Sequence, residues 1–250
     1  MTTLRRLFRN TSVLIVANAI QPLLSFYLIV TISRVLEVEG LGAYATVFNY
    51  QAIFQIFAAF GLRNLLTRNL AQQPQATARY LWHGSLLVLP FSLLSIVGLI
   101  ALTALLQYPE LVFWATVIVS ASLIAAALIE VGEGVLAGLE RLHMVGYSAI
   151  FENVLRVGLS LIVLAKGYGL LALVWIFVAS RYSRALFYFW YIHRHLLPAS
   201  VVARGKLDLD WTFARQLLRQ APVFALTMIC VTVYWKVDIS ILSKARGLEE

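Results

Sequence analysis

The chain has 250 residues, of which 61% are hydrophobic and 13% charged, against about 45–50% and about 25% in an ordinary soluble domain. Its mean hydropathy is +0.83 and its formal net charge is +8. Too few polar residues are present to cover a soluble surface, which excludes an ordinary cytosolic enzyme, a disordered protein and a secreted disulfide scaffold. The composition predicts an all-α polytopic membrane protein whose helices face lipid.

Seven stretches are long and apolar enough to cross a bilayer, which takes about 20 residues. They cover residues 11–33, 41–62, 81–106, 111–136, 145–165, 170–192 and 222–242. The first stretch is too long for the apolar core of a signal peptide and lacks a cleavage site, so it should be a retained signal anchor. Apart from the link between the sixth and seventh stretches the connections are short, so consecutive spans should pack as antiparallel neighbours.

Basic residues are distributed unequally between the two ends of the predicted spans. With the N-terminus inside, twelve of them lie on the inner side: Arg5, Arg6, Arg9, Arg63, Arg68, Arg79, Arg141, Arg194, Arg204, Lys206, Arg215 and Arg219. Four lie outside: Arg34, Lys166, Lys244 and Arg246. This asymmetry predicts a multi-pass membrane protein with its N-terminus in the cytoplasm. It also explains most of the net charge, so no nucleic-acid partner is needed.

The one long connection divides the chain into three parts. We expect residues 1–193 to form an N-terminal six-helix transmembrane bundle. Residues 194–220 should form a basic amphipathic linker on the cytoplasmic surface. Residues 221–250 should hold the first transmembrane helix of a second, truncated bundle.

A gapless shift of 210 residues supports that division. It places residues 10–13 over 220–223 and residues 33–34 over 243–244, so that helix falls on helix and loop on loop. Chance and an internal repeat, which is a feature of transporter folds, both account for the few identities. On the repeat interpretation, the chain is a fragment of a protein about twice as long.

Charged residues lie within the later spans, where charges are costly and face the bundle interior or water. They are Glu130, Glu133, Glu152, Arg156, Arg181, Arg184, Lys236 and Asp238. Residues three or four positions apart share a helix face, so Glu152 can pair with Arg156. Arg181 and Arg184 have no acid within reach on their own helix and need one from another helix, water or an anionic ligand.

Two interpretations of these charges remain open. In the first, they are structural ion pairs that lock helices together, with Glu130 and Glu133 reaching Arg184 across the bundle. In the second, the cations line a water-filled cavity that opens to the cytoplasm and binds phosphate through guanidinium forks. On the second interpretation the arginines Arg156, Arg181 and Arg184 line the cavity, with Glu130, Glu133, Glu152 and Asp238 as charge partners.

Uncharged polar residues mark faces of the first two spans. Asn18 and Gln21 share a face of the first span with Ser25, and Gln55 marks one side of the second; they either line the cavity or hydrogen-bond between helices. Glycines at 132, 134 and 138 favour close packing, and the aromatic run 187–191 is typical of an interfacial belt. The single cysteine and four scattered histidines have no metal-site spacing, so we expect neither metal nor cofactor.

Several short stretches together resemble one family of transporters. They are the basic start before Asn10, SRVLEVEGLGAY (33–44), the segment 61–71 ending in RNLA, LAGLER (136–141) and DISILSK (238–244). These residues are similar to the polysaccharide-flippase branch of the multidrug/oligosaccharidyl-lipid/polysaccharide (MOP) exporters, such as Wzx-type O-antigen flippases. The resemblance implies a protein of the inner, cytoplasmic membrane with two pseudo-symmetric six-helix bundles, of which this chain holds the first and one helix of the second. It also implies the role of cavity cations for Arg156, Arg181, Arg184 and Lys236.

The resemblance also implies an activity. Such proteins flip undecaprenyl-pyrophosphate-linked oligosaccharides from the inner to the outer leaflet by alternating access, for O-antigen of lipopolysaccharide, capsule or exopolysaccharide. The expected partners are the lipid-linked substrate, membrane lipids and a polysaccharide polymerase or export machinery. A drug or cation antiporter of the same fold is the alternative, but it would need a buried acid without neighbouring arginines. A membrane-embedded glycan polymerase or ligase would need a large loop with catalytic acids or histidines, so we expect no enzyme.

Overall fold

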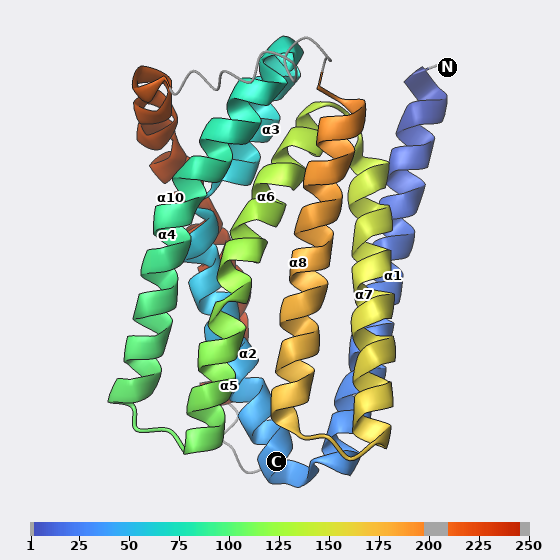
Figure 1. Ribbon diagram of the computed structural model, residues 1–250, viewed down its shortest axis with the longest axis vertical. Coiled ribbons are helices and arrows are strands. Elements are labelled where there is room, and N and C mark those ends of the chain that lie inside the picture. The colour runs from blue at the N-terminus through green and yellow to red at the C-terminus, as the bar shows by residue number, and fades with distance from the viewer. Residues whose placement is uncertain (1–2, 198–209, 246–250) are drawn as a thin grey trace.

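The computed structural model describes residues 3–197 and 210–245, and the elements in this part of the chain are all helical (Figure 1). Six helical segments are long and apolar enough to cross a membrane: Asn10–Val35, Glu37–Gln72, Pro74–Leu105, Glu110–Gly138, Leu142–Ala165 and Leu170–His195. The expected all-α polytopic membrane fold is therefore confirmed. The seventh predicted span lies within a continuous helix, α10 (Trp211–Ala245).

The helices before α10 follow the predicted spans in order, with two divisions that the sequence did not predict. They are α1 (Thr3–Val35), α2 (Glu37–Ala59), α3 (Leu62–Gln72), the 3-10 turn η1 (Pro74–Ala76), α4 (Thr77–Leu105), α5 (Glu110–Ser120), α6 (Ser122–Gly138), α7 (Leu142–Ala165) and α8 (Leu170–His195). A turn at Phe60 and Gly61, both with positive φ, separates α3 from α2. The fourth span breaks at Ala121, whose carbonyl accepts a hydrogen bond from the Tyr182 hydroxyl at 3.0 Å. That hydrogen bond satisfies a backbone carbonyl at the break, where lipid offers no hydrogen-bond donor.

Helix α6 is the centre of the bundle. The span that contains it is buried over 61% of its most apolar window, against 11% for the span of α1, which lies at the rim. Glycines let α3 approach α6 closely: a Cβ atom on Gly134 would lie 2.8 Å from the Arg63 carbonyl oxygen, and one on Gly138 would lie 2.7 Å from Leu70 Cβ. The predicted close packing at these glycines is confirmed.

One end of the bundle gathers the start of α1, helix α3 and the turn between α6 and α7; we call it the N-terminal face (Figure 1, top). Here the Asn10 side chain joins α1 to that turn. Its amide nitrogen donates to the Glu140 carbonyl at 2.8 Å, and its oxygen accepts the backbone N–H of His143 at 3.2 Å. Two of the stretches that carry the family resemblance therefore meet in space.

Helix α10 is anchored at the N-terminal face by the residues around its start. Asp210 forms an ion pair with Arg79 of α4, and its backbone N–H donates to His83 Nε2 at 3.2 Å. His83 Nδ1 lies 2.8 Å from the Arg79 carbonyl, which assigns the imidazole proton to Nδ1. The Phe213 ring packs edge-on against Tyr80 and His83 and lies 4.1 Å from the Arg79 guanidinium carbon.

The predicted linker, 194–220, overlaps this anchor only in part. Its residues 198–209 lie outside the described part of the chain, and α10 then runs through the expected boundary at 220/221 without a break. The division of the chain into three parts remains a prediction.

Asp210 caps α10 as a carboxylate. A hydrogen bond from the Thr212 hydroxyl and one from the backbone N–H of Phe213 lower the pKa of the Asp210 carboxyl to about 2. A lowered pKa means that the cap stabilises the fold fully above the ordinary value of 3.8 and loses its effect as the pH falls through about 2. The cap is therefore charged at physiological pH.

Replacing Asp210 with alanine should loosen the first turn of α10, because three donors lose their acceptor. We expect faster amide hydrogen exchange at Thr212 and Phe213 in the alanine variant. In the wild type, the protection that the cap gives these two amides should not change between pH 5 and 8. Asp210→Asn is the matched control: it keeps an oxygen acceptor for the cap and removes the charge that faces Arg79. Equal exchange in the alanine variant and the wild type would contradict the capping role.

Candidate functional site

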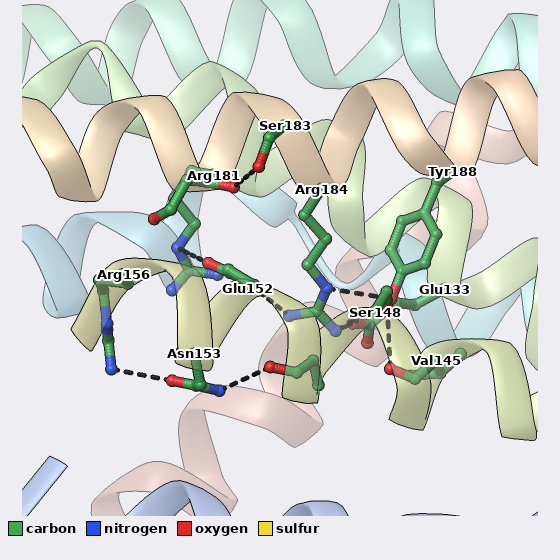
Figure 2. A network of polar contacts seen from close by, with 12 residues as sticks. Glu133, Val145, Ser148, Glu152, Asn153, Arg156, Arg181, Ser183, Arg184 and Tyr188 are labelled. Atoms are coloured by element: carbon green, nitrogen blue, oxygen red, sulfur yellow. Dashed lines mark hydrogen bonds and ion pairs between the residues drawn. The ribbon is translucent and has the colours of Figure 1, made fainter. Parts of the chain in front are cut away.

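A network of polar side chains joins α6, α7 and α8 in the interior of the bundle (Figure 2). Glu130 and Glu133 lie one turn apart on α6, Glu152 and Arg156 on α7, and Arg181 and Arg184 on α8, so each helix presents its pair on one face. We use the term polar network for these residues together with their hydrogen-bonding neighbours: Arg63, Glu130, Glu133, Ser148, Glu152, Asn153, Arg156, Arg181, Arg184 and Tyr188.

Arg184 is the centre of the polar network. Its guanidinium contacts Glu133 on α6 and donates from Nη1 to Glu152 Oε2 on α7 at 2.9 Å. Its Nε and Nη2 also donate to the Tyr188 hydroxyl at 3.1 and 2.9 Å. Only 11% of the Arg184 side chain is exposed, so two carboxylates and a hydroxyl stabilise a buried charge. This arrangement ties three helices together.

Tyr188 connects Arg184 to its surroundings. Its hydroxyl donates to Glu133 Oε1 at 3.3 Å and accepts from Ser148 Oγ at 2.6 Å. The ring fits against Gly132: a Cβ atom there would lie 2.9 Å from ring atom Cδ2. The glycine therefore provides the space that lets the tyrosine enter the network.

Arg63 extends the polar network to the N-terminal face. From α3 its Nη1 lies 3.1 Å from Glu133 Oε2 and 4.0 Å from Glu130 Oε2. The Arg63 side chain is 38% exposed, against 7% for Glu133. Charges thus alternate from an exposed arginine through Glu133, Arg184 and Glu152 to Arg181 in the interior.

Arg156 and Arg181 form the deep end of the network. Each lies 14 residues from the end of its helix at the N-terminal face, which is about 21 Å along a helix. Their guanidinium carbons lie 5.8 and 5.1 Å from the centre of the Phe177 ring, within the range of a cation–π contact. Two like charges therefore share one aromatic residue near the middle of the bundle.

The arginines at the deep end are incompletely paired. Arg156 Nη2 donates to Asn153 Oδ1 at 2.9 Å and reaches Ser25 Oγ on α1 at 3.5 Å, and both acceptors are neutral. Within the described part of the chain, Arg156 contacts no acid, and the buried Nε atoms of Arg156 and Arg181 have no hydrogen-bond partner. The described network therefore holds four arginines against three glutamates, and the excess positive charge lies at its deep end.

The structure decides which of the predicted charge pairs form. Glu152 does not pair with Arg156 one turn away; its carboxylate points to α8 and lies 3.5 Å from Arg181 Nε and 2.9 Å from Arg184 Nη1. The Glu152–Arg156 pair that the spacing allows does not form, because two arginines across the helix interface attract the carboxylate more strongly than one on the same helix. Glu133 does reach Arg184, whereas Glu130 pairs with Arg63 instead.

The other predicted site residues lie apart from this network or cannot be placed against it. Asn18 and Gln21 are exposed on α1, and Gln55 accepts a hydrogen bond from Gln51 along α2 at 3.0 Å. Lys236 and Asp238 belong to α10, and their side chains lie outside the described part of the structure. Among the described residues no group of His, Cys, Asp or Glu has an arrangement that could hold a metal ion.

Sequence reasoning missed Tyr188 and Arg63. The run 187–191 was assigned to an interfacial belt, which suits Trp190 at 59% exposure but not Tyr188, which is fully buried. Arg63 was counted only as a loop cation, because α3 was not predicted. A tyrosine at i+4 from Arg184 and a glycine beside Glu133 were the available signals.

A pocket of about 610 Å³ lies at the opposite face, where α2, α5 and α8 meet. Its walls are mainly apolar, and its charged lining residues, Glu37 and Glu39, are both exposed. None of the lining residues belongs to the polar network, so this pocket is separate from it.

Comparisons with known proteins agree with this architecture. The family model described as "Polysaccharide biosynthesis protein" matches residues 7–250. Among solved structures, the chain is similar to the eukaryotic MATE transporter AtDTX14, with a TM-score of 0.67 and 16% identity over 96% of this chain and 56% of that one. It is also similar to a MOP superfamily transporter from Pyrococcus furiosus, with a TM-score of 0.65 and 14% identity over 94% and 55%.

The chain thus spans about half the length of both solved transporters. A search of the curated proteins found no match. The family model covers nearly the whole chain, and the two structures share its fold, so the chain belongs to the polysaccharide biosynthesis protein family and has the helical fold of the MOP superfamily transporters.

Proposed function

We propose that this chain is part of a flippase for undecaprenyl-pyrophosphate-linked oligosaccharides, which it moves from the inner to the outer leaflet of the cytoplasmic membrane by alternating access. The product would supply a cell-surface polysaccharide such as O-antigen, capsule or exopolysaccharide. The basic residues at the N-terminal face support a cytoplasmic location for that end. A polysaccharide polymerase or export machinery would receive the flipped substrate.

The observation that carries this proposal is the excess positive charge at Arg156 and Arg181. A buried cation without a full set of partners is costly, and a transported anion would supply the missing contacts. Guanidinium groups suit phosphate because they donate two parallel hydrogen bonds. Arg184 is less available to an anionic substrate than the sequence predicted, because it already contacts two glutamates.

A drug or cation antiporter is the alternative on this fold, which the chain shares with a solved MATE transporter. A cationic substrate would need an excess of acid in the interior. The described network has more arginines than glutamates, which favours an anionic substrate.

Arg156→Ala and Arg181→Ala in the native protein should each lower surface polysaccharide by about tenfold or more, because a lost charge-assisted contact to phosphate costs about 1.5–3 kcal/mol. Surface glycan is measured by labelling intact cells, and lipid-linked oligosaccharide should accumulate in their membranes. Arg68→Ala is the matched control, because Arg68 is exposed on α3. Normal surface glycan in both interior variants, at wild-type protein levels, would overturn the proposal.

A further inference from the structure

Glu152 is shared unevenly between two arginines. Its Oε2 atom accepts a hydrogen bond from Arg184 Nη1 at 2.9 Å. Its Oε1 atom lies 3.5 Å from Arg181 Nε, and that nitrogen has no hydrogen-bond partner in the described structure. The contact with Arg181 is therefore electrostatic attraction without an aligned hydrogen bond, and it is the weaker of the two.

Among the described residues, Glu152 also contacts fewer side chains than Glu133, the other buried glutamate of the polar network. Glu133 contacts Arg63 and Arg184 and accepts from the Tyr188 hydroxyl. Glu152 contacts only Arg181 and Arg184 among the described residues. It can release Arg181 and keep its stronger bond to Arg184, and Arg184 retains Glu133 throughout.

A phosphate group at the deep end would compete with Glu152. Arg156 and Arg181 approach the same phenyl ring, and each has a buried Nε atom without a hydrogen-bond partner in the described part. A phosphate with two negative charges that binds both guanidinium groups supplies the acceptors that Glu152 does not. Glu152 would then lose its contact with Arg181, because its carboxylate and the phosphate compete for the same guanidinium group.

We infer that Glu152 is a built-in competitor of the transported phosphate: it occupies Arg181 in the empty site and weakens phosphate binding so that the substrate can leave. This inference rests on the proposed function, which places phosphate at Arg156 and Arg181. A transport site must bind its substrate well enough to take it up and weakly enough to release it. An internal carboxylate meets both needs, because it neutralises Arg181 when the site is empty and lowers the affinity for phosphate when the site is filled.

The test is Glu152→Gln in the purified native protein, with inorganic pyrophosphate as the probe and calorimetry as the measurement. Glutamine keeps a hydrogen-bond acceptor for Arg184 and removes the charge that competes at Arg181. We expect pyrophosphate to bind about tenfold more tightly. In cells the same variant should display less surface polysaccharide, because release becomes slower.

The matched control is Glu110→Gln. It removes the same charge from an exposed position in the first turn of α5, outside the polar network. Its affinity for pyrophosphate should stay close to wild type. If Glu152→Gln fails to fold, Glu152→Asp replaces it: a side chain shorter by one methylene draws the carboxylate back from Arg181, whose contact is already the longer of the two at 3.5 Å, and tighter binding is again expected.

The outcomes separate this inference from the proposed function. If Arg156→Gln and Arg181→Gln bind pyrophosphate as wild type does, the phosphate site itself is wrong. If those variants lose binding while Glu152→Gln binds no more tightly than Glu110→Gln, the phosphate site stands and the competitor role of Glu152 is overturned.

Discussion

Glu133→Ala is expected to lower the free energy of unfolding by about 3–5 kcal/mol, the usual cost of removing one partner from a buried ion pair. Glu133 is 7% exposed at its side chain and contacts Arg63 and Arg184. Its loss leaves Arg184 with one carboxylate and deprives the Tyr188 hydroxyl of its acceptor. Much less folded protein should be recovered in detergent, and its thermal unfolding temperature should fall.

Glu130→Ala is the control for this prediction. Glu130 lies on the same helix, is more exposed, and touches Arg63 only at 4.0 Å, so the expected loss is about 0–1 kcal/mol. A second test replaces both Glu133 and Arg184 with leucine. Because the double variant leaves no unpaired charge at that contact, it should be less destabilised than the sum of the single variants. Equal stability of Glu133→Ala and Glu130→Ala would show that the contacts of Glu133 do not stabilise the fold.

The sequence was sufficient to predict the number and order of the first six spans. A run of about 20 apolar residues has few alternatives to a membrane helix, so each of the six observed segments contains most of one predicted span, although the second and third extend beyond it through α3 and the start of α4. The break at Ala121 was not predicted, and the hydrogen bond that its carbonyl accepts comes from Tyr182 on another helix, which a local sequence pattern does not show. Helix α3 was missed because its mixture of polar and apolar residues resembles a loop until it packs on α6.

The candidate site was predictable in its composition and only partly in its pairing. Charges within spans are rare enough to be noticed one by one, and Glu130, Glu133, Glu152 and the arginines on α7 and α8 were all found. Their partners depend on how α6, α7 and α8 are rotated about their axes, which spacing along one helix does not determine. For that reason the spacing allows a pair of Glu152 with Arg156 on its own helix, whereas Glu152 contacts arginines on α8.

Gly132→Leu should also disrupt the site, because it fills the space that the Tyr188 ring occupies, whereas Glu133→Ala removes a charge. Even a Cβ atom on Gly132 would lie 2.9 Å from Tyr188 Cδ2 and 3.0 Å from Tyr188 Cβ. The ring must move, and its hydroxyl then leaves both Arg184 and Glu133. Overpacking costs about 1–3 kcal/mol, and each buried polar group left without its partner adds about 1–3 kcal/mol, so we expect loss of both folded protein and surface polysaccharide.

The matched control is Gly158→Leu on α7. Gly158 is exposed, and a Cβ atom there would meet nothing within 4 Å, so a leucine should face lipid without strain. Both variants add the same side chain to a membrane helix, and only one of them meets Tyr188. Tyr188→Phe separates the two effects further, because it keeps the ring against Gly132 and removes only the hydroxyl. If Gly132→Leu unfolds at the same temperature as Gly158→Leu, the close fit of Tyr188 against α6 does not hold the network together.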